Sequence, residues 1–136
     1  MAPDTEVLSV TFAGTPAVAP GGRCPVLTAT INFPGEADPG GPFTVNQTQC
    51  LDPANPGIIT DGEFTWSFTN GDALSGTYQG VTTPSGTPGI VNIDEDFTIT
   101  SGAGEFEGAS GRAQAIGTFN EVTRAAAVTA VAAFTH

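Results

Sequence analysis

The chain contains no lysine, and its only histidine is the last residue, His136. Its positive charge rests on three arginines, Arg23, Arg112 and Arg124, against 14 acidic residues, which gives a formal net charge of −11 at pH 7. A chain with this balance repels phosphate backbones and anionic lipid surfaces. We therefore expect neither nucleic acid nor an anionic membrane as a partner, and the simplest role of the acidic surplus is solubility.

Sulfur and imidazole ligands are also scarce. Cys24 and Cys50 are the only cysteines, and with one histidine they are too few for a closed structural zinc site, so we expect no metal site of this kind. A disulfide between them is the favoured interpretation. It would close a loop of about 27 residues and contribute roughly 3.5 kcal/mol through chain entropy. Because disulfides persist in oxidising compartments, we predict a secreted or periplasmic protein.

No apolar run approaches the roughly 18 residues of a membrane helix, so we expect no membrane insertion. The opening sequence MAPDTEVLSV has neither the basic start nor the apolar stretch of a signal peptide. We expect Met1 to stand at the start of the mature chain. A length of 136 residues fits one core, so residues 1–136 are predicted to form a single domain.

Helix signals are almost absent, while short runs rich in β-branched and aromatic residues alternate with Gly, Pro, Asn and Asp clusters. This pattern is typical of an all-β sandwich or barrel. The alanine-rich tail is interrupted by β-branched residues, so strand is favoured there over helix. Eight strands are predicted, approximately Val7–Phe12, Val26–Phe33, Phe43–Cys50, Glu63–Thr69, Ala73–Gln79, Val91–Thr100, Arg112–Phe119 and Thr123–Phe134.

The sharpest turn signal is Asn70-Gly71, which supplies the two positive φ angles of a type I′ hairpin. Prolines cannot donate to a sheet ladder, so proline-rich stretches are predicted to be irregular connections rather than strands. Four such connections are expected, Gly14–Gly22, Pro34–Pro42, Asp52–Gly62 and Gly80–Gly89. Long loops gathered at one end of a barrel would form a lid or a mouth.

The segment from Ile99 to Gly117 reads ITSGAGEFEGASGRAQAIG, an apolar strand, a glycine-rich turn around Phe106 and a second strand. This segment, preceded by NGD…GTYQG and DFTI elements in the same order, resembles the signature of the allene oxide cyclase and dirigent-protein barrel superfamily. The closest likeness is to short exported bacterial members. It covers about Glu63 to Phe119, and Phe106 is expected to pack the barrel end.

The resemblance implies an eight-stranded antiparallel barrel with an apolar interior. It also implies cofactor-free cyclisation or guided radical coupling and assembly into homo-oligomers, dimers or trimers. It carries over no set of catalytic residues.

One polar residue interrupts an apolar row. Strict alternation from Val91 to Ile99 places Val91, Ile93, Glu95, Phe97 and Ile99 on one face. Apolar surroundings disfavour a carboxylate and raise its pKa, which suits a general acid or base, so Glu95 is the candidate catalytic residue. Two alternatives are a β-bulge at Asp94–Asp96 that returns Glu95 to solvent, and an arginine partner.

Three further residues are candidate ligand-binding residues. Arg112 begins the strand after the glycine turn, where it would pair with Glu95 or a ligand carboxylate, or remain a surface charge. Tyr78 and Trp66 would line a cavity mouth, with their polar tips orienting a ligand and their rings supplying apolar contact. Both would serve equally well as plain core.

Other chemistries have weaker support. Asp94, Glu95 and Asp96 are consecutive acids, but they do not follow the spacing of known calcium loops. The GASG stretch lacks the spacing of a nucleophile elbow, and the glycines precede neither Gly-Lys-Ser nor a helix, as a phosphate loop would.

The sequence thus predicts a small barrel that binds an apolar or amphipathic small molecule in its interior, with cofactor-free cyclase or isomerase activity as an extension. The alternative is a non-catalytic secreted structural or interaction protein whose barrel is filled by its own side chains. An eight-stranded interior is wide enough for either arrangement.

Overall fold

The computed structural model describes residues 5–136, so Met1, the expected mature start, lies outside the described residues. Nine strands form one antiparallel sheet, with two single 3₁₀ turns, η1 (Thr69–Gly71) and η2 (Gly104–Phe106), and no α-helix in the described part. The strands are β1 (Thr5–Gly14), β2 (Ala17–Pro20), β3 (Leu27–Asp38), β4 (Gly41–Leu51), β5 (Ile58–Phe68), β6 (Ala73–Pro84), β7 (Ile90–Ala103), β8 (Ser110–Asn120) and β9 (Ala126–Thr135). No helix within residues 5–136 is long and apolar enough to cross a membrane.

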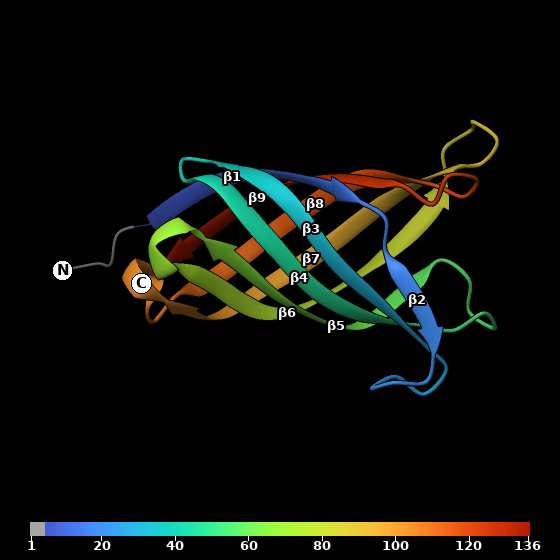
Figure 1. Cartoon of the computed structure of the whole chain (residues 1–136), viewed down its shortest axis with the longest axis horizontal. Coiled ribbons are helices and arrows are strands. Elements are labelled where there is room, and N and C mark those ends of the chain that lie inside the picture. The colour runs from blue at the N-terminus through green and yellow to red at the C-terminus, as the bar shows by residue number, and fades with distance from the viewer. Residues whose placement is uncertain (1–4) are drawn as a thin grey trace.

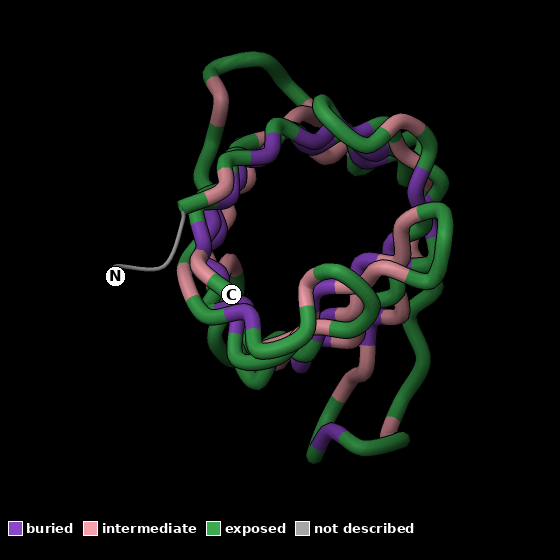
Figure 2. The backbone as a smooth tube through the Cα atoms, turned by 90° about the vertical axis from the view of Figure 1, so that its left-hand side faces the viewer, coloured by how far each residue is buried: buried purple, intermediate pink, exposed green. Residues whose placement is uncertain are grey.

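The sheet closes because β1 pairs with both β9 and β3. Eight strands make the closed ring that Figure 2 shows end-on, and the short β2 adds to the edge of β3. The predicted all-β, eight-stranded antiparallel barrel is confirmed. All eight predicted strands are present, and the alanine-rich tail is the strand β9, whose residues alternate between buried and exposed from Ala126 onward.

The four stretches predicted to be irregular contain connections, but each is also partly strand, and that part of the prediction was wrong. β2 lies within Gly14–Gly22, β3 continues through Pro34 to Asp38, β5 starts at Ile58, and β6 extends to Pro84. Pro34 is tolerated because β3 changes partners there. On one side, β3 pairs with β2 as far as Thr30 and with β1 from Gly35 onward. Pro34 lies between these two stretches, where no neighbouring strand needs its backbone N–H as a hydrogen-bond donor.

The two ends of the barrel differ (Figure 1). We call one the loop end, where the connections 21–26, 52–57, 85–89 and 121–125 gather. The other is the plug end, which carries η1, η2 and the β3–β4 turn. At the plug end Asn70 and Gly71 both have positive φ, 69° and 80°, as predicted for the hairpin. The loop is longer than a type I′ turn, since the Phe68 N–H donates to the Asp72 carbonyl over 2.8 Å.

Aromatic side chains fill the plug half of the interior. Trp66 is fully buried, with ring centroids of Phe64, Phe97, Phe43 and Phe12 at 5.1, 5.3, 6.1 and 6.3 Å. We call this group, with its neighbours Phe68, Tyr78, Phe106 and Phe134, the aromatic plug.

Phe106 packs its ring against Phe68 and Phe134, with centroids 5.7 and 5.1 Å apart, and closes the barrel end as predicted. The glycine-rich turn permits this. Gly104 and Gly108 have positive φ, and a Cβ on Gly102 would lie 2.1 Å from the Phe106 carbonyl oxygen.

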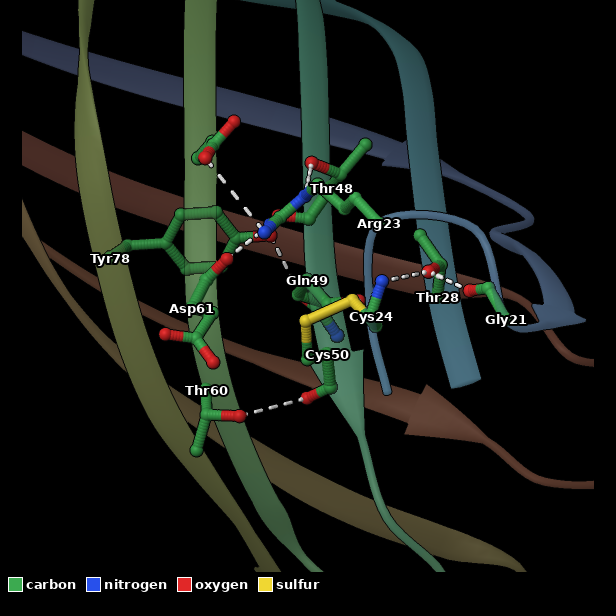
Figure 3. Close-up of a disulfide and its surroundings, with 11 residues drawn as sticks. Gly21, Arg23, Cys24, Thr28, Thr48, Gln49, Cys50, Thr60, Asp61 and Tyr78 are labelled. Carbon is green, nitrogen blue, oxygen red and sulfur yellow. Dashed lines mark hydrogen bonds and ion pairs between the residues drawn. A yellow bond between two sulfur atoms is a disulfide. The ribbon is translucent and has the colours of Figure 1, made fainter. Parts of the chain in front are cut away.

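The Cys24–Cys50 disulfide predicted from the sequence is present (Figure 3). It ties the connection after β2 to the end of β4, and the adjacent Arg23 holds the same region. Arg23 Nε donates to Thr48 Oγ1 over 2.8 Å, and its Nη2 donates to the carbonyls of Thr48 and Asp61. The bond is consistent with an extracellular or periplasmic location.

Candidate functional site

The loop half of the barrel holds a cavity of about 370 Å³. Its wall is mostly apolar and is contributed by strands from all around the ring, including Ile31, Phe33, Ile59, Ile93, Phe119 and Val128. Asp52, Glu121 and Arg124 lie at its rim, in or beside the loop-end connections. A cavity of this volume, with few polar groups in an apolar wall, is typical of a site for one small molecule.

Glu95 lines this cavity from β7 and is only 4% exposed. Its register with Gly80 of β6 and Ala115 of β8 is continuous, so the alternative of a β-bulge at Asp94–Asp96 is excluded. Gly80 makes room for the carboxyl side chain, because a Cβ on Gly80 would lie 2.7 Å from Glu95 Cγ. Glu95 forms no hydrogen bond or ion pair with any residue from 5 to 136, so the alternative of an arginine partner is also excluded.

Two glutamines of β4 share the cavity wall with Glu95. Gln47 and Gln49 are both buried, and each uses its side-chain oxygen to accept a hydrogen bond from an aromatic residue. Trp66 Nε1 donates to Gln47 Oε1 over 3.0 Å, and the Tyr78 hydroxyl donates to Gln49 Oε1 over 2.7 Å. Gln47 Nε2 is buried and has no partner among the described residues. A polar cluster therefore lies where the cavity meets the aromatic plug.

Burial dominates the acid–base properties of this cluster. It raises the pKa of Glu95 from 4.5 to about 7, and the neighbouring carboxylate of Asp94 adds to the shift. Burial also raises the pKa of Tyr78 well above its usual range, as does the nearby charge of Glu95, while Gln47 and Arg23 act weakly in the opposite direction. Tyr78 therefore stays protonated at neutral pH and remains a donor, whereas Glu95 changes charge near neutrality.

Glu95 should make the fold less stable as the pH rises. Its folded pKa of about 7 exceeds the ordinary 4.5, so the folded state binds the proton more tightly. The stabilisation is complete below about pH 4.5 and is lost as the pH rises through about 7. Glu95→Gln removes this titration, so at alkaline pH the variant should be more stable than the wild type by about 3 kcal/mol.

Urea denaturation of both proteins across this pH range measures the difference directly, because any effect of the overall negative charge is common to both. The difference should shrink toward zero below about pH 4.5. A difference that stays constant with pH would contradict the assignment of the titration to Glu95.

The other predicted site residues lie apart from the cavity wall. Trp66 belongs to the aromatic plug, and Tyr78 is buried with its ring stacked on Phe97. Trp66 donates a hydrogen bond to Gln47 and Tyr78 donates one to Gln49. Arg112 is exposed and lines an outer groove with Arg23 and Asp96. Arg112 lies near neither Glu95 nor the cavity, because the side chains of Arg112 and Glu95 point to opposite faces of the barrel wall.

The consecutive acids do not converge, since Asp94 and Asp96 are exposed on the outer face while Glu95 points inward. Within residues 5–136 no group of three or more His, Cys, Asp or Glu side chains is placed to hold a metal ion.

Sequence reasoning missed Gln47 and Gln49. The same signal that singled out Glu95 was available for them, because alternation along β4 puts both on the face of Phe43 and Val45. On both β4 and β7, a polar side chain that interrupts a row of apolar side chains lies on the inner face of the barrel.

The fold and the site define a class: a closed eight-stranded antiparallel barrel with one added edge strand, which contains a buried aromatic cluster and a mostly apolar cavity. A scan of family models and searches of curated proteins and of solved structures find no match to this chain.

Proposed function

We propose that this protein binds an apolar or amphipathic small molecule in the cavity of the loop half. One observation carries the proposal: an apolar cavity of about 370 Å³ is lined by the carboxyl group of Glu95, which is only 4% exposed and has no hydrogen-bond or ion-pair partner among residues 5–136. Burying such a group costs free energy unless something satisfies it, and folding alone would favour an apolar residue there. A ligand with a polar group at one end would fill the space and satisfy Glu95.

The binding experiment uses a matched pair of neighbouring alanines on β9. Ala126 is buried and lines the cavity, whereas Ala127 is exposed on the outer face. Ala126→Phe places a benzyl group in the cavity and should weaken binding of the neutral fluorescent probe N-phenylnaphthylamine by about tenfold or more, while Ala127→Phe should bind like the wild type. Fluorescence titration measures both, and equal affinity for the two variants would exclude the cavity as the site.

The catalytic extension is a cofactor-free cyclase or isomerase reaction in which Glu95 moves a proton. A pKa of about 7 suits a general acid or base near neutral pH. Extraction and mass spectrometry of molecules that co-purify with the protein would supply candidate substrates. Glu95→Gln should then abolish turnover, and unchanged turnover in this variant would reject the catalytic role.

A second candidate function is that of a non-catalytic protein that works through its surface or its assembly. The aromatic plug favours it, because half of the interior is already filled by side chains. Val7, Val131 and Ile116 are exposed on the neighbouring strands β1, β9 and β8, and a homodimer or homotrimer would cover such a face. Light scattering coupled to size exclusion tests this, and a monomer at high concentration would count against it.

We also propose export to an extracellular or periplasmic location and kinship with the allene oxide cyclase and dirigent-like barrels. The disulfide supports the first proposal. The barrel closure and the glycine-rich connection between β7 and β8 support the second. Two free thiols in protein isolated without reductant, counted by mass spectrometry, would overturn the argument for export.

A further inference from the structure

We propose that the polar end of the ligand is an uncharged carbonyl group, held at the base of the cavity by hydrogen bonds from Gln47 and Glu95. The inference rests on the proposed binding function and adds the chemical class of the ligand. It follows from which hydrogen-bonding atoms of the polar cluster are already occupied and which remain free.

Trp66 fixes the orientation of the Gln47 amide. An indole N–H can only donate, so the atom of Gln47 that faces it at 3.0 Å must be the oxygen. The Gln47 amide nitrogen therefore points elsewhere, and it is buried without a hydrogen-bond partner within residues 5–136. An unsatisfied buried N–H group costs about 1–3 kcal/mol, which a ligand acceptor would recover.

Tyr78 fixes Gln49 in the same way. The burial that keeps Tyr78 protonated makes its hydroxyl the donor to Gln49 Oε1 over 2.7 Å. The oxygens of both glutamines are thus engaged by aromatic donors, and their nitrogens are the atoms left for a ligand. The β4 side of the polar cluster offers donors only, which selects a ligand group that accepts.

Glu95 completes the set from β7, which is separated from β4 by β5 and β6 in the ring. The groups facing it are few: Gly80 and Ala115 flank it on β6 and β8, Tyr78 is the nearest titratable side chain on β6, and Asp94 precedes it on β7. Asp52, Glu121 and Arg124 lie at the rim of the cavity. None of these neutralises Glu95, so below about pH 7 its carboxyl is protonated and provides a further O–H donor.

Charge disfavours the two ionic alternatives. An anionic ligand would enter a protein of net charge −11 and meet Glu95, whose negative form it would repel. A cationic amine would find one carboxylate but would bring its own N–H donors to the donors of Gln47 and Gln49. A neutral carbonyl oxygen has two lone pairs and no hydrogen, so it can accept one hydrogen bond from Gln47 and one from Glu95.

Four probes with the same number of carbons and a phenyl ring separate these cases: benzylacetone, phenylbutylamine, phenylbutyrate and butylbenzene. Each probe is tested in competition with N-phenylnaphthylamine for binding to the wild-type protein. The measurements are made at two pH values, roughly two units below and two units above the Glu95 pKa of about 7. We expect benzylacetone, the ketone, to bind about tenfold more tightly than any of the others at the lower pH. Its affinity should fall by about tenfold at the higher pH, where Glu95 no longer donates.

Two variants assign the effect to the named groups. Glu95→Gln should remove the pH dependence of ketone binding, because an amide does not titrate in this range. Gln47→Met keeps the length of the side chain but loses the donor, so the preference for benzylacetone over butylbenzene should fall toward one.

The outcomes distinguish the two proposals. If no probe binds, including the fluorescent one, the binding function itself fails. If butylbenzene binds as well as the ketone, or phenylbutylamine binds best, the cavity is a binding site but the carbonyl assignment is wrong. A preference for the ketone that is unchanged in both Glu95→Gln and Gln47→Met would also overturn the assignment.

Discussion

Replacing Trp66 with alanine should lower the free energy of unfolding by about 4–5 kcal/mol, the largest single-residue effect that we expect in this protein. Trp66 is fully buried and contacts four other aromatic rings, so truncation would leave a large cavity at the centre of the aromatic plug. It would also leave the oxygen of Gln47 without its donor. Urea denaturation followed by circular dichroism measures the loss.

Trp66→Phe is the matched control. It keeps an aromatic ring in the plug but removes the indole N–H, so its cost should be about 1–3 kcal/mol, mainly from the unpaired Gln47 oxygen. The difference between the two variants separates packing from hydrogen bonding. A cost below about 2 kcal/mol for Trp66→Ala would mean that the plug is not the main source of stability in this half of the barrel.

Removing the disulfide should produce the second largest effect. The double variant Cys24→Ser/Cys50→Ser opens a loop with a sequence separation of 26 residues, and the chain-entropy model gives a loss of about 3.5 kcal/mol. The hydrogen bonds of Arg23 to Thr48 and Asp61 still hold this region, so the variant should fold with a lower midpoint (Figure 3).

The double serine variant and the reduced wild type should unfold at the same urea concentration, and reductant should leave the variant unchanged. This control separates the bond from the substitutions. If reduction leaves the midpoint of the wild type unchanged, the Cys24–Cys50 bond does not constrain the unfolded chain as the loop-length argument requires.

The aromatic plug and the cavity show which structural features local sequence patterns can predict. Alternation along β7 correctly placed Glu95 on the inner face, since side chains on a strand have a period of two and β7 has no bulge near it. The same rule could have placed Gln47 and Gln49 inside. No local rule says that these three residues, which lie on β4 and β7, share one cavity, because that depends on how the barrel closes.

The roles of Trp66, Tyr78 and Arg112 could not be predicted from local sequence patterns. Tryptophan, tyrosine and arginine can line a binding site, but they can equally well belong to the core or the surface. Only the position of each residue in the barrel shows which of these roles it has. Trp66 and Tyr78 are buried and donate hydrogen bonds to the glutamines, while Arg112 faces outward. Proline was also an unreliable signal for a connection. Pro34 lies in a strand, at a point where no neighbouring strand needs a backbone N–H donor.

The sequence by itself determined the all-β class, the eight strands of the ring, the Cys24–Cys50 pairing, the Asn70-Gly71 hairpin and the inward carboxyl group of Glu95. Each of these depends on local backbone preferences, on alternation or on there being only two cysteines. Tertiary structure alone decided the added strand β2, the division of the interior into plug and cavity, and the free amide nitrogen of Gln47. Those features depend on contacts between residues far apart in the chain, which form only when β1 closes the barrel against β3 and β9.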